Sequence, residues 1–291
     1  MKKLLALIMA MLLVMTVFAG CGSDNTASTP DTDDTADTTS DNNDNQGGEN
    51  TDTTPDADAT GDLKYIKDKG KLVVGMTVYK PMNYKDDNGE WTGFDTEFAE
   101  AVAKELGVDV EFMTIDWNNK WASLRTKKID VVWNGMTLTE EAKTNASCTD
   151  TYVLNAQVVV MKKDNLANYT TADSVKGLKF AVEAGSAGED IAKENKYNYI
   201  SYKAQTDALN AVRSGKTDAC IIDITMAKAM TGENTSYSNL GMGVSLSEEE
   251  YAIACRKDSN LTAKINELMK KLYDDGTLPA LAKKYNLTLA F

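Results

Sequence analysis

Short apolar runs alternate with amphipathic, helix-length stretches along the chain from residue 62 onward. In one of these stretches, apolar side chains recur every four residues from Phe94 to Leu106, and Gly107 follows as a helix cap. The first series predicts a strand at 71–75, a helix at 93–107, a strand at 108–112, a helix at 121–126 and a strand at 129–133. This βαβαβ order predicts a parallel sheet with right-handed crossovers.

A second series of the same kind follows the first. It predicts a strand at 155–161, a strand at 178–182, a helix at 188–194, a strand at 199–202, a helix at 206–213 and a strand at 219–222. At 291 residues the chain is long enough for two domains. The two series therefore predict two α/β domains of similar, Rossmann-like construction.

One segment, which leads from a predicted helix into a predicted strand, occurs in two similar copies. Residues 125–137 read RTKKIDVVWNGMT, and residues 213–225 read RSGKTDACIIDIT. Without a gap, the alignment matches Arg125 with Arg213, Lys128 with Lys216, Asp130 with Asp218 and Thr137 with Thr225. Each copy is predicted to lead into the third strand of its domain. Ligands of open α/β sheets bind beyond the carboxyl ends of the strands, so both copies are expected to end at a shared cleft.

Two apolar runs are predicted to cross between the domains. The run at 250–257 is expected to pair with the run at 155–163, and the helices at 261–273 and 278–285 then return to the first domain. The domain division is predicted as 62–154 plus 256–291 for domain 1, and 155–255 for domain 2. The two crossings would leave a ligand cleft between the two domains.

The N-terminal residues have the pattern of an export signal. Lys2 and Lys3 precede an apolar run from Leu4 to Phe18, and Ala19-Gly20-Cys21 follows. The run has the length of a signal-peptide core and is short for a membrane span. Residues 1–21 are interpreted as a lipoprotein signal peptide with Cys21 as the lipidated residue. The alternative is an ordinary signal peptide with an incidental cysteine.

Residues 22–60 are rich in Asp, Thr, Asn, Ser and Gly, and this composition predicts a disordered, acidic tether. The segment holds 11 of the 44 acidic residues and none of the 31 basic ones. The net charge of −13 therefore describes mainly the tether, not the ligand. An acidic segment without Lys or Arg argues against nucleic acid as a partner.

Cysteine and histidine usage narrows the chemistry. The chain has no histidine, which removes the commonest general base and the commonest metal ligand. Beyond Cys21, the three cysteines have no metal-binding spacing, and Cys220 and Cys255 lie inside apolar runs. No metal or cofactor is predicted.

Four segments together resemble the bacterial extracellular solute-binding proteins of family 3, the receptors of polar amino-acid ABC importers. They are GFDTEFAEAVAKEL from 93, KKIDVVWNGMTLTEE from 127, DACIID from 218 and YDDGTLPALAKKY from 273. The resemblance covers nearly all of residues 62–291. It implies the fold of a type II periplasmic binding protein, with the ligand cleft between the two domains. It also implies an ABC permease as partner, a small polar solute as ligand, and a monomer anchored through Cys21 to the outer face of the cell membrane.

The resemblance also implies a set of ligand-binding residues. Tyr79 and Trp117 match aromatics on the two sides of the ligand, and Asp223 matches the acid that pairs with its α-ammonium group. The full set is Tyr79, Trp117, Asn134, Gly135, Thr137, Glu183, Ser186 and Asp223. Gly135 and Thr137 match groups that bind the amino and carboxylate ends, Ser186 matches a carboxylate donor, and Glu183 falls where the family varies with ligand.

Each of these residues also has a structural interpretation. Tyr79 and Trp117 also fit ordinary core positions. Thr137 with Glu140, and Ser186 with Glu189, also fit helix capping boxes. Asp223 is the hardest to explain structurally, because an acid at the end of an apolar run needs a partner.

Ala142 departs from the family pattern. Relatives place an arginine there that clamps the ligand α-carboxylate with two hydrogen bonds. Its loss predicts a ligand without a free α-carboxylate, such as an amine, a betaine-like cation or a masked amino acid. The alternative is an ordinary amino acid, with Lys143, Lys120 or Arg125 reaching in.

Three functions compete on this interpretation. The first is a substrate-binding lipoprotein of an ABC importer for a polar amino acid or a related amine. The second is a ligand-sensing lipoprotein without transport. The third is a dehydratase-type enzyme on the same scaffold, with Glu183 as general acid. A non-enzyme is predicted.

Overall fold

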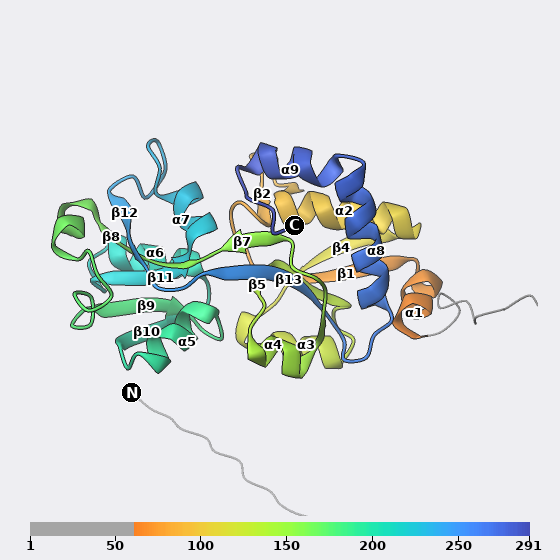
Figure 1. Cartoon of the computed structure of the whole chain (residues 1–291), viewed down its shortest axis with the longest axis horizontal. Helices are drawn as coiled ribbons and strands as arrows, with labels where there is room; N and C mark the ends of the chain where they lie inside the picture. Colours follow the sequence, from red (N-terminus) through yellow and green to blue (C-terminus); the bar gives the residue numbers. More distant parts are fainter. Residues whose placement is uncertain (1–60) are drawn as a thin grey trace, which may run out of the picture. The chain divides into compact units, whose positions relative to one another are not determined.

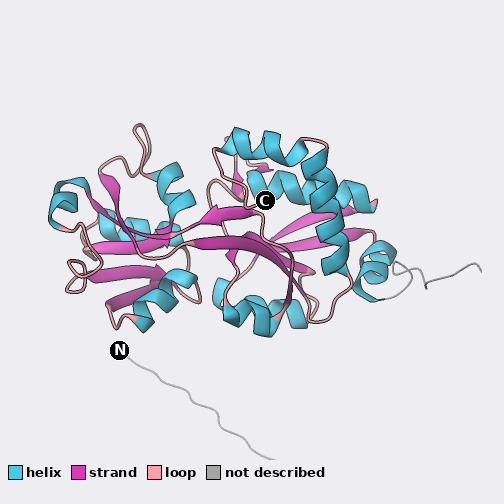
Figure 2. Cartoon of the chain, viewed as in Figure 1, coloured by secondary structure: helices cyan, strands magenta, loops and turns pink. Residues whose placement is uncertain are grey.

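The computed structural model describes residues 61–291. The predicted signal peptide at 1–21, with Cys21, and the predicted tether at 22–60 lie outside the described residues. Within the described part, the strands form two large sheets and one small hairpin of β2 (Tyr84–Lys85) and β3 (Trp91–Thr92) (Figures 1 and 2). The described helices lie against these sheets, as expected for an α/β protein.

The first sheet has the strand order β4-β1-β5-β13-β6, and β7 also pairs with β13. The strands are β1 (Lys71–Met76), β4 (Asp109–Thr114), β5 (Val131–Thr137), β6 (Ser147–Cys148), β7 (Val153–Asn155) and β13 (Glu249–Cys255). β4, β1 and β5 are parallel to one another, while β13 is antiparallel to β5. The predicted parallel βαβαβ unit is therefore present, with antiparallel strands added at one edge.

Helices cover both faces of the first sheet (Figure 1). One face carries α2 (Phe94–Leu106), α8 (Leu261–Asp274) and α9 (Thr277–Tyr285), and the other α3 (Lys120–Arg125) and α4 (Glu140–Asn145). Alternate strand residues divide between the faces, so that Val74 and Trp133 pack with α2, and Val73 and Val132 pack beside α3. The C-terminal helices return to the first sheet, as predicted.

The second sheet has the order β10-β9-β11-β8-β12. Its strands are β8 (Gln157–Lys162), β9 (Lys179–Glu183), β10 (Asn198–Tyr202), β11 (Ala219–Asp223) and β12 (Leu240–Ser245). The helices α6 (Gln205–Arg213) and α7 (Ile224–Met230) pack in one apolar cluster, and α5 (Ala187–Glu194) packs in another with the alternate strand residues. Two short 3₁₀ helices, η2 (Trp117–Asn119) and η3 (Lys163–Asn168), complete the described elements.

The sequence repeat is also a structural repeat. β4-β1-β5 and β10-β9-β11 have the same order, with β1 between β4 and β5 in the first sheet and β9 between β10 and β11 in the second. The aspartate of each copy fixes this arrangement. Asp130 donates its N–H to Val73 O and accepts from Val73 N through its carboxylate, at 2.8 Å each. Asp218 makes the same pair of bonds with Lys179, at 2.9 and 2.8 Å.

The predicted pairing of 250–257 with 155–163 is wrong for most of its length. β13 pairs with β7, so that Glu249 faces Asn155 and Tyr251 faces Val153. β8 instead lies between β11 and β12 in the second sheet. The chain leaves one sheet and enters the other around Ala156, which divides the long apolar run into two strands. β12 was not predicted, because its two glycines weaken the strand pattern.

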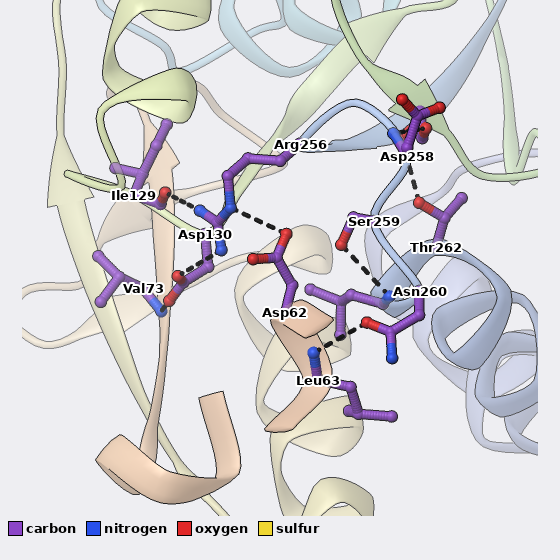
Figure 3. Close-up of polar contacts among 12 residues, drawn as sticks. Asp62, Leu63, Val73, Ile129, Asp130, Arg256, Asp258, Ser259, Asn260 and Thr262 are labelled. Atoms are coloured by element: carbon purple, nitrogen blue, oxygen red, sulfur yellow. Dashed lines mark hydrogen bonds and ion pairs between the residues drawn. The ribbon is translucent and has the colours of Figure 1, made fainter. Parts of the chain in front are cut away.

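α1 (Gly61–Lys69), which the sequence pattern did not predict, is held against the first sheet by a buried ion network (Figure 3). Arg256, directly after β13, donates to Asp62 at 2.9 Å and to Asp130 at 3.2 Å. Asn260 Oδ1 accepts from Leu63 N at 3.0 Å. Cys220 and Cys255 are buried, as their apolar surroundings predict, and they lie unpaired in different sheets.

Candidate ligand-binding cleft

A pocket of about 480 Å³, part of it open to solvent, is lined by residues that follow or end strands of both sheets. β5 of the first sheet ends there at Thr137, and β9 and β11 of the second sheet end there at Glu183 and Asp223. This is the edge at which open α/β sheets bind ligands. All eight residues of the predicted set line this pocket: Tyr79, Trp117, Asn134, Gly135, Thr137, Glu183, Ser186 and Asp223.

Asp223 is a buried carboxylate whose hydrogen-bond partners are all uncharged. Its Oδ1 accepts from Asn155 Nδ2, from Gln157 Nε2 at 2.8 Å and from Tyr251 OH at 3.0 Å, and its Oδ2 accepts from Gln205 Nε2. Burial, with the charge of Glu249 second, raises the pKa of Asp223 to about 7. A ligand cation would therefore supply a counter-charge that these amides and this phenol do not.

Glu249 lies beside Asp223 where the chain crosses between the sheets. Asn155 Nδ2 and Gln157 Nε2 each donate to Glu249 Oε2 at 3.0 Å, as well as to Asp223. Thr137 Oγ1 at the end of β5 donates to the same Glu249 oxygen at 2.9 Å. The hydroxyl proton of Thr137 is therefore donated to Glu249, so towards the pocket the Thr137 hydroxyl can act only as a hydrogen-bond acceptor.

Glu183 is the second buried acid of the pocket. Its side-chain atom Oε1 has no hydrogen-bond partner among the described residues. Burial is the main cause that raises the pKa of Glu183 to about 8, and the negative charge of Asp223 adds to it. A buried oxygen without a partner is costly, so this position favours a ligand group that donates a hydrogen bond.

The two predicted aromatics lie on the first-sheet side of the pocket. Tyr79 follows β1, and its hydroxyl contacts Tyr251 in β13 and Thr225 in α7, which ties this loop to the helix that follows β11. Burial raises the pKa of Tyr79 well above its usual value, so the phenol stays neutral. Trp117 opens η2, which Asp116 caps by accepting from Asn118 N at 3.1 Å.

Two predicted residues already use their polar groups in hydrogen bonds to residues that pack with the first sheet. Asn134 accepts from Thr77 N and Oγ1 through Oδ1, and its Nδ2 donates to Thr77 O and to Asn83 Oδ1. Its amide thus has no hydrogen-bonding capacity left for a ligand. Gly135 donates its N–H to Asp95 Oδ2 at 2.6 Å. Gly135 also has a φ of +54°, and a Cβ there would lie 2.8 Å from the Tyr79 ring.

The capping alternatives have different outcomes. Ser186 is the N-cap of α5, because its Oγ accepts from Glu189 N at 3.2 Å. The box of Thr137 with Glu140 is wrong. Thr139 caps α4 instead, accepting from Ala142 N at 3.1 Å. Thr137 lies two residues earlier, at the end of the strand.

Ala142 lines the pocket and is 1% exposed. Of the three cations suggested as substitutes for an arginine there, Lys143 pairs with Glu140 at 2.7 Å on the exposed side of α4. Arg125 is exposed at the far end of α3 and does not line the pocket. Lys120, at the start of α3, is 4% exposed and does line it.

Sequence reasoning missed several residues of the pocket. Gln157 and Gln205 hold Asp223, and Trp121 and Glu141 join α3 to α4 through a 2.8 Å bond from Trp121 Nε1. The residues missed were polar and scattered, so no local pattern marked them. Asp95, in the quoted GFD segment, does not line the pocket, but its carboxylate holds Gly135, which does, and burial raises the pKa of Asp95 to about 7.

Comparison with known proteins decides the family. Residues 72–288 match the model of the bacterial extracellular solute-binding proteins, family 3. The chain belongs to this family. It is 31% identical to the L-cystine-binding protein TcyJ of Escherichia coli over 229 residues, covering 77% of this chain and 86% of TcyJ. It is 34% identical to the arginine-binding extracellular protein ArtP of Bacillus subtilis over 224 residues, covering 75% of this chain and 86% of ArtP.

Solved structures agree with the fold. A mutant of the arginine-binding protein ArgBP from T. maritima superposes with a TM-score of 0.71 at 33% identity, covering 76% of this chain and 97% of that one. The ancestral amino acid-binding protein AncCDT-1, a precursor of cyclohexadienyl dehydratase, gives 0.72 at 33% identity, covering 77% and 99%. The predicted type II periplasmic-binding-protein fold is therefore confirmed. Among the helices of residues 61–291, none has the length and apolar character needed to span a bilayer.

Proposed function

We propose that this protein is the substrate-binding component of an ABC importer and that it binds a polar amino acid or a related amine-bearing solute. The family and the amino-acid-binding relatives support this function. We also propose that the two sheets belong to two domains, 62–154 plus 256–291 and 155–255, which close on the ligand. The two chain crossings at β7 and β13 are what such a hinge requires.

The observation that carries the proposal is the state of Asp223. A buried carboxylate is normally paired with a cation, and the hydrogen bonds to Asp223 come only from amides and a phenol. An α-ammonium group in the pocket completes this arrangement. Tyr79 and Trp117 line the same pocket, and aromatic faces attract cations.

The remaining residues are assigned to the rest of the ligand. The start of α5 at Ser186 presents backbone N–H groups to the pocket and suits a carboxylate, although the Ser186 hydroxyl itself serves the cap. Glu183 accepts a donor from the ligand side chain through its unpartnered oxygen. Thr137 contributes through its position at the hinge, and Asn134 shapes the wall without binding.

We further propose that the mature protein is a monomer held to the outer face of the cell membrane through lipidated Cys21. The Ala19-Gly20-Cys21 junction directly before an acidic, lysine-free segment supports this. The anchored protein delivers its solute to a membrane permease. A receptor without transport would have the same pocket, and a permease gene beside this one separates the two functions.

A ligand screen tests the binding function. The protein without residues 1–21 is heated with each of the twenty amino acids, L-cystine, L-ornithine, simple amines and betaines. A ligand at 100 times its Kd adds about 2.7 kcal/mol to native stability, which raises the melting temperature measurably. Hits are then measured by calorimetry. Stabilisation by an amino acid or amine is expected, and the absence of any such hit contradicts the proposal.

A dehydratase is the second candidate, because AncCDT-1 is a dehydratase precursor and the raised pKa of Glu183, about 8, suits a general acid. We favour binding, since TcyJ and ArtP are both named as binding proteins. Mass spectrometry of each hit after incubation with the protein decides between them. A loss of about 18 mass units, one water, from a ligand, abolished in Glu183→Gln, would establish the enzyme.

A further inference from the structure

Lys120 is a buried cation in a pocket that is otherwise acidic. It opens α3 on the first-sheet side and is 4% exposed. Among the described residues that line the pocket it is the one cation, whereas four carboxylic side chains line it: Glu141, Glu183, Asp190 and Asp223. A lysine in such a place is unusual, because lysine side chains are almost never fully buried without a partner.

The ammonium group of Lys120 is held from both sides. Its Nζ donates to Gly185 O at 2.8 Å, in the loop before α5 on the second-sheet side. It also lies 5.1 Å from the ring centroid of Trp117 and 5.0 Å from that of Trp121. These contacts aim the group across the pocket, from one domain toward the other, and fix where its remaining N–H bonds point.

The contacts of Lys120 leave part of its bonding capacity for a ligand. An ammonium group has three donors, and one of them has an acceptor within the described residues, Gly185 O. Burial lowers the pKa of Lys120, while the surrounding acids, with Glu141 first, oppose this and favour the charged form. The aromatic faces stabilise the charge without using the N–H groups.

We propose that Lys120 binds the carboxylate of the ligand and thereby sets the specificity of the pocket for zwitterions over simple amines. The proposal rests on the proposed binding function and names a residue for it. Asp223 ends a strand of the second sheet, whereas Lys120 opens α3, which packs on the first sheet, and the two carry opposite charges, so one α-amino acid bridges them. Buried Ala142 then needs no arginine, because the positive charge reaches the pocket from α3 instead of α4.

The competing explanation is purely structural. The Lys120–Gly185 bond joins the two sides of the pocket, so Lys120 could close the domains without touching the ligand. The two roles differ in one measurable respect. A latch affects every ligand equally, whereas a carboxylate-binding group affects only ligands that carry a carboxylate.

The test compares each binding amino acid with its α-amide, starting with L-arginine and L-argininamide and with L-histidine and L-histidinamide. Calorimetry at about pH 6.5 keeps both α-amino groups largely charged, since that of the amide titrates near 8, as in a peptide, and that of the free amino acid titrates higher. In wild type the acid is expected to bind more tightly. Lys120→Met is expected to weaken binding of the acid by about 30-fold or more, as for a broken buried charge pair, and binding of the amide by less than about threefold.

Two further variants complete the test. Lys120→Arg retains the charge and is expected to keep the preference for the acid. Lys143→Met removes a lysine of α4 that does not line the pocket and is expected to change neither affinity. Circular dichroism and melting curves check that Lys120→Met folds; if it does not, Lys120→Gln takes its place.

The outcomes separate the two proposals. If Lys120→Met loses the same affinity for acid and amide, or loses affinity for neither, the proposed role of Lys120 is overturned and the binding function stays intact. The same holds if the wild-type protein binds the amide as tightly as the acid. If no amino acid binds the wild-type protein, the proposed function fails, and the role of Lys120 fails with it.

Discussion

Replacing Asp223 by asparagine is expected to weaken binding of an amino acid or amine strongly while leaving the fold intact. The side chain keeps nearly the same shape and loses its charge. Its present partners are uncharged, so the ligand ammonium would be its cationic partner. Removing one member of a buried charge pair costs about 2–5 kcal/mol, a factor of about 30 to 5,000 in Kd. Circular dichroism checks folding, and calorimetry measures Kd.

The pH dependence of binding sharpens this test. Burial raises the pKa of Asp223 to about 7, so its ionised fraction rises from about 0.1 at pH 6 to about 0.9 at pH 8. An ammonium ligand needs the ionised form, and we expect wild-type affinity to increase about tenfold over this range, with proton release on binding. The Asp223→Asn variant lacks this contribution, and the pKa of Glu183 falls in the variant because the charge of Asp223 no longer raises it.

The assay is calorimetry at about pH 6, 7 and 8 in two buffers with different ionisation enthalpies, which counts the protons released. Equal affinity of the two proteins would show that Asp223 does not face the ligand. If Asp223→Asn binds more weakly but its affinity changes with pH as much as that of wild type, Asp223 is already ionised in the ligand-free protein. That result would refute the argument that burial raises the pKa of Asp223.

Three further predictions concern single side chains. Glu183→Gln should stabilise the ligand-free protein increasingly from about pH 5 to pH 9, because a raised folded-state pKa costs wild type stability as pH rises; melting curves with no pH-dependent gain would contradict this. In the Lys120→Met variant, the added substitution Ala142→Arg should raise the preference for acid over amide again by at least about tenfold, as measured by calorimetry. Ala142 is buried, so melting curves must first show that the larger side chain does not destabilise the protein. Cys21→Ser should abolish fatty-acid labelling and release the protein from membranes, and an unlabelled wild type would exclude the lipid anchor.

The sequence predicted the elements with strong periodicity and missed those without it. α2 runs from Phe94 to Leu106 and ends at Gly107 in the left-handed conformation, as its four-residue spacing and its glycine indicated. β12 was missed because glycines occupy two of its six positions. The strand partners of 155–161 were also misjudged, since apolar runs show that a strand is buried but not which strand lies beside it.

The sequence predicted which residues line the pocket, but not which of their polar groups are already hydrogen-bonded within the protein. Resemblance placed all eight residues on one pocket wall or another. It did not show that the amide of Asn134 is saturated by Thr77 and Asn83, because those bonds join residues 57 and 51 positions apart. Lys120 was one of three candidate cations in the sequence, and only the packing of Trp117 and Trp121 around it shows which of them is buried in the pocket.

The ion network on α1 determines where the N-terminal segment joins the fold. The N-terminal segment enters the fold through α1, which Arg256 joins to Asp130 at the start of β5. The pocket lies at the other end of that strand, at Thr137, about 20 Å away for seven extended residues. If Cys21 anchors the protein as proposed, a pull on the anchor reaches the first sheet at the end of β5 opposite the pocket. The second sheet, with Asp223 and Glu183, lies off that path, so the proposed domain closure would leave the anchor point in place.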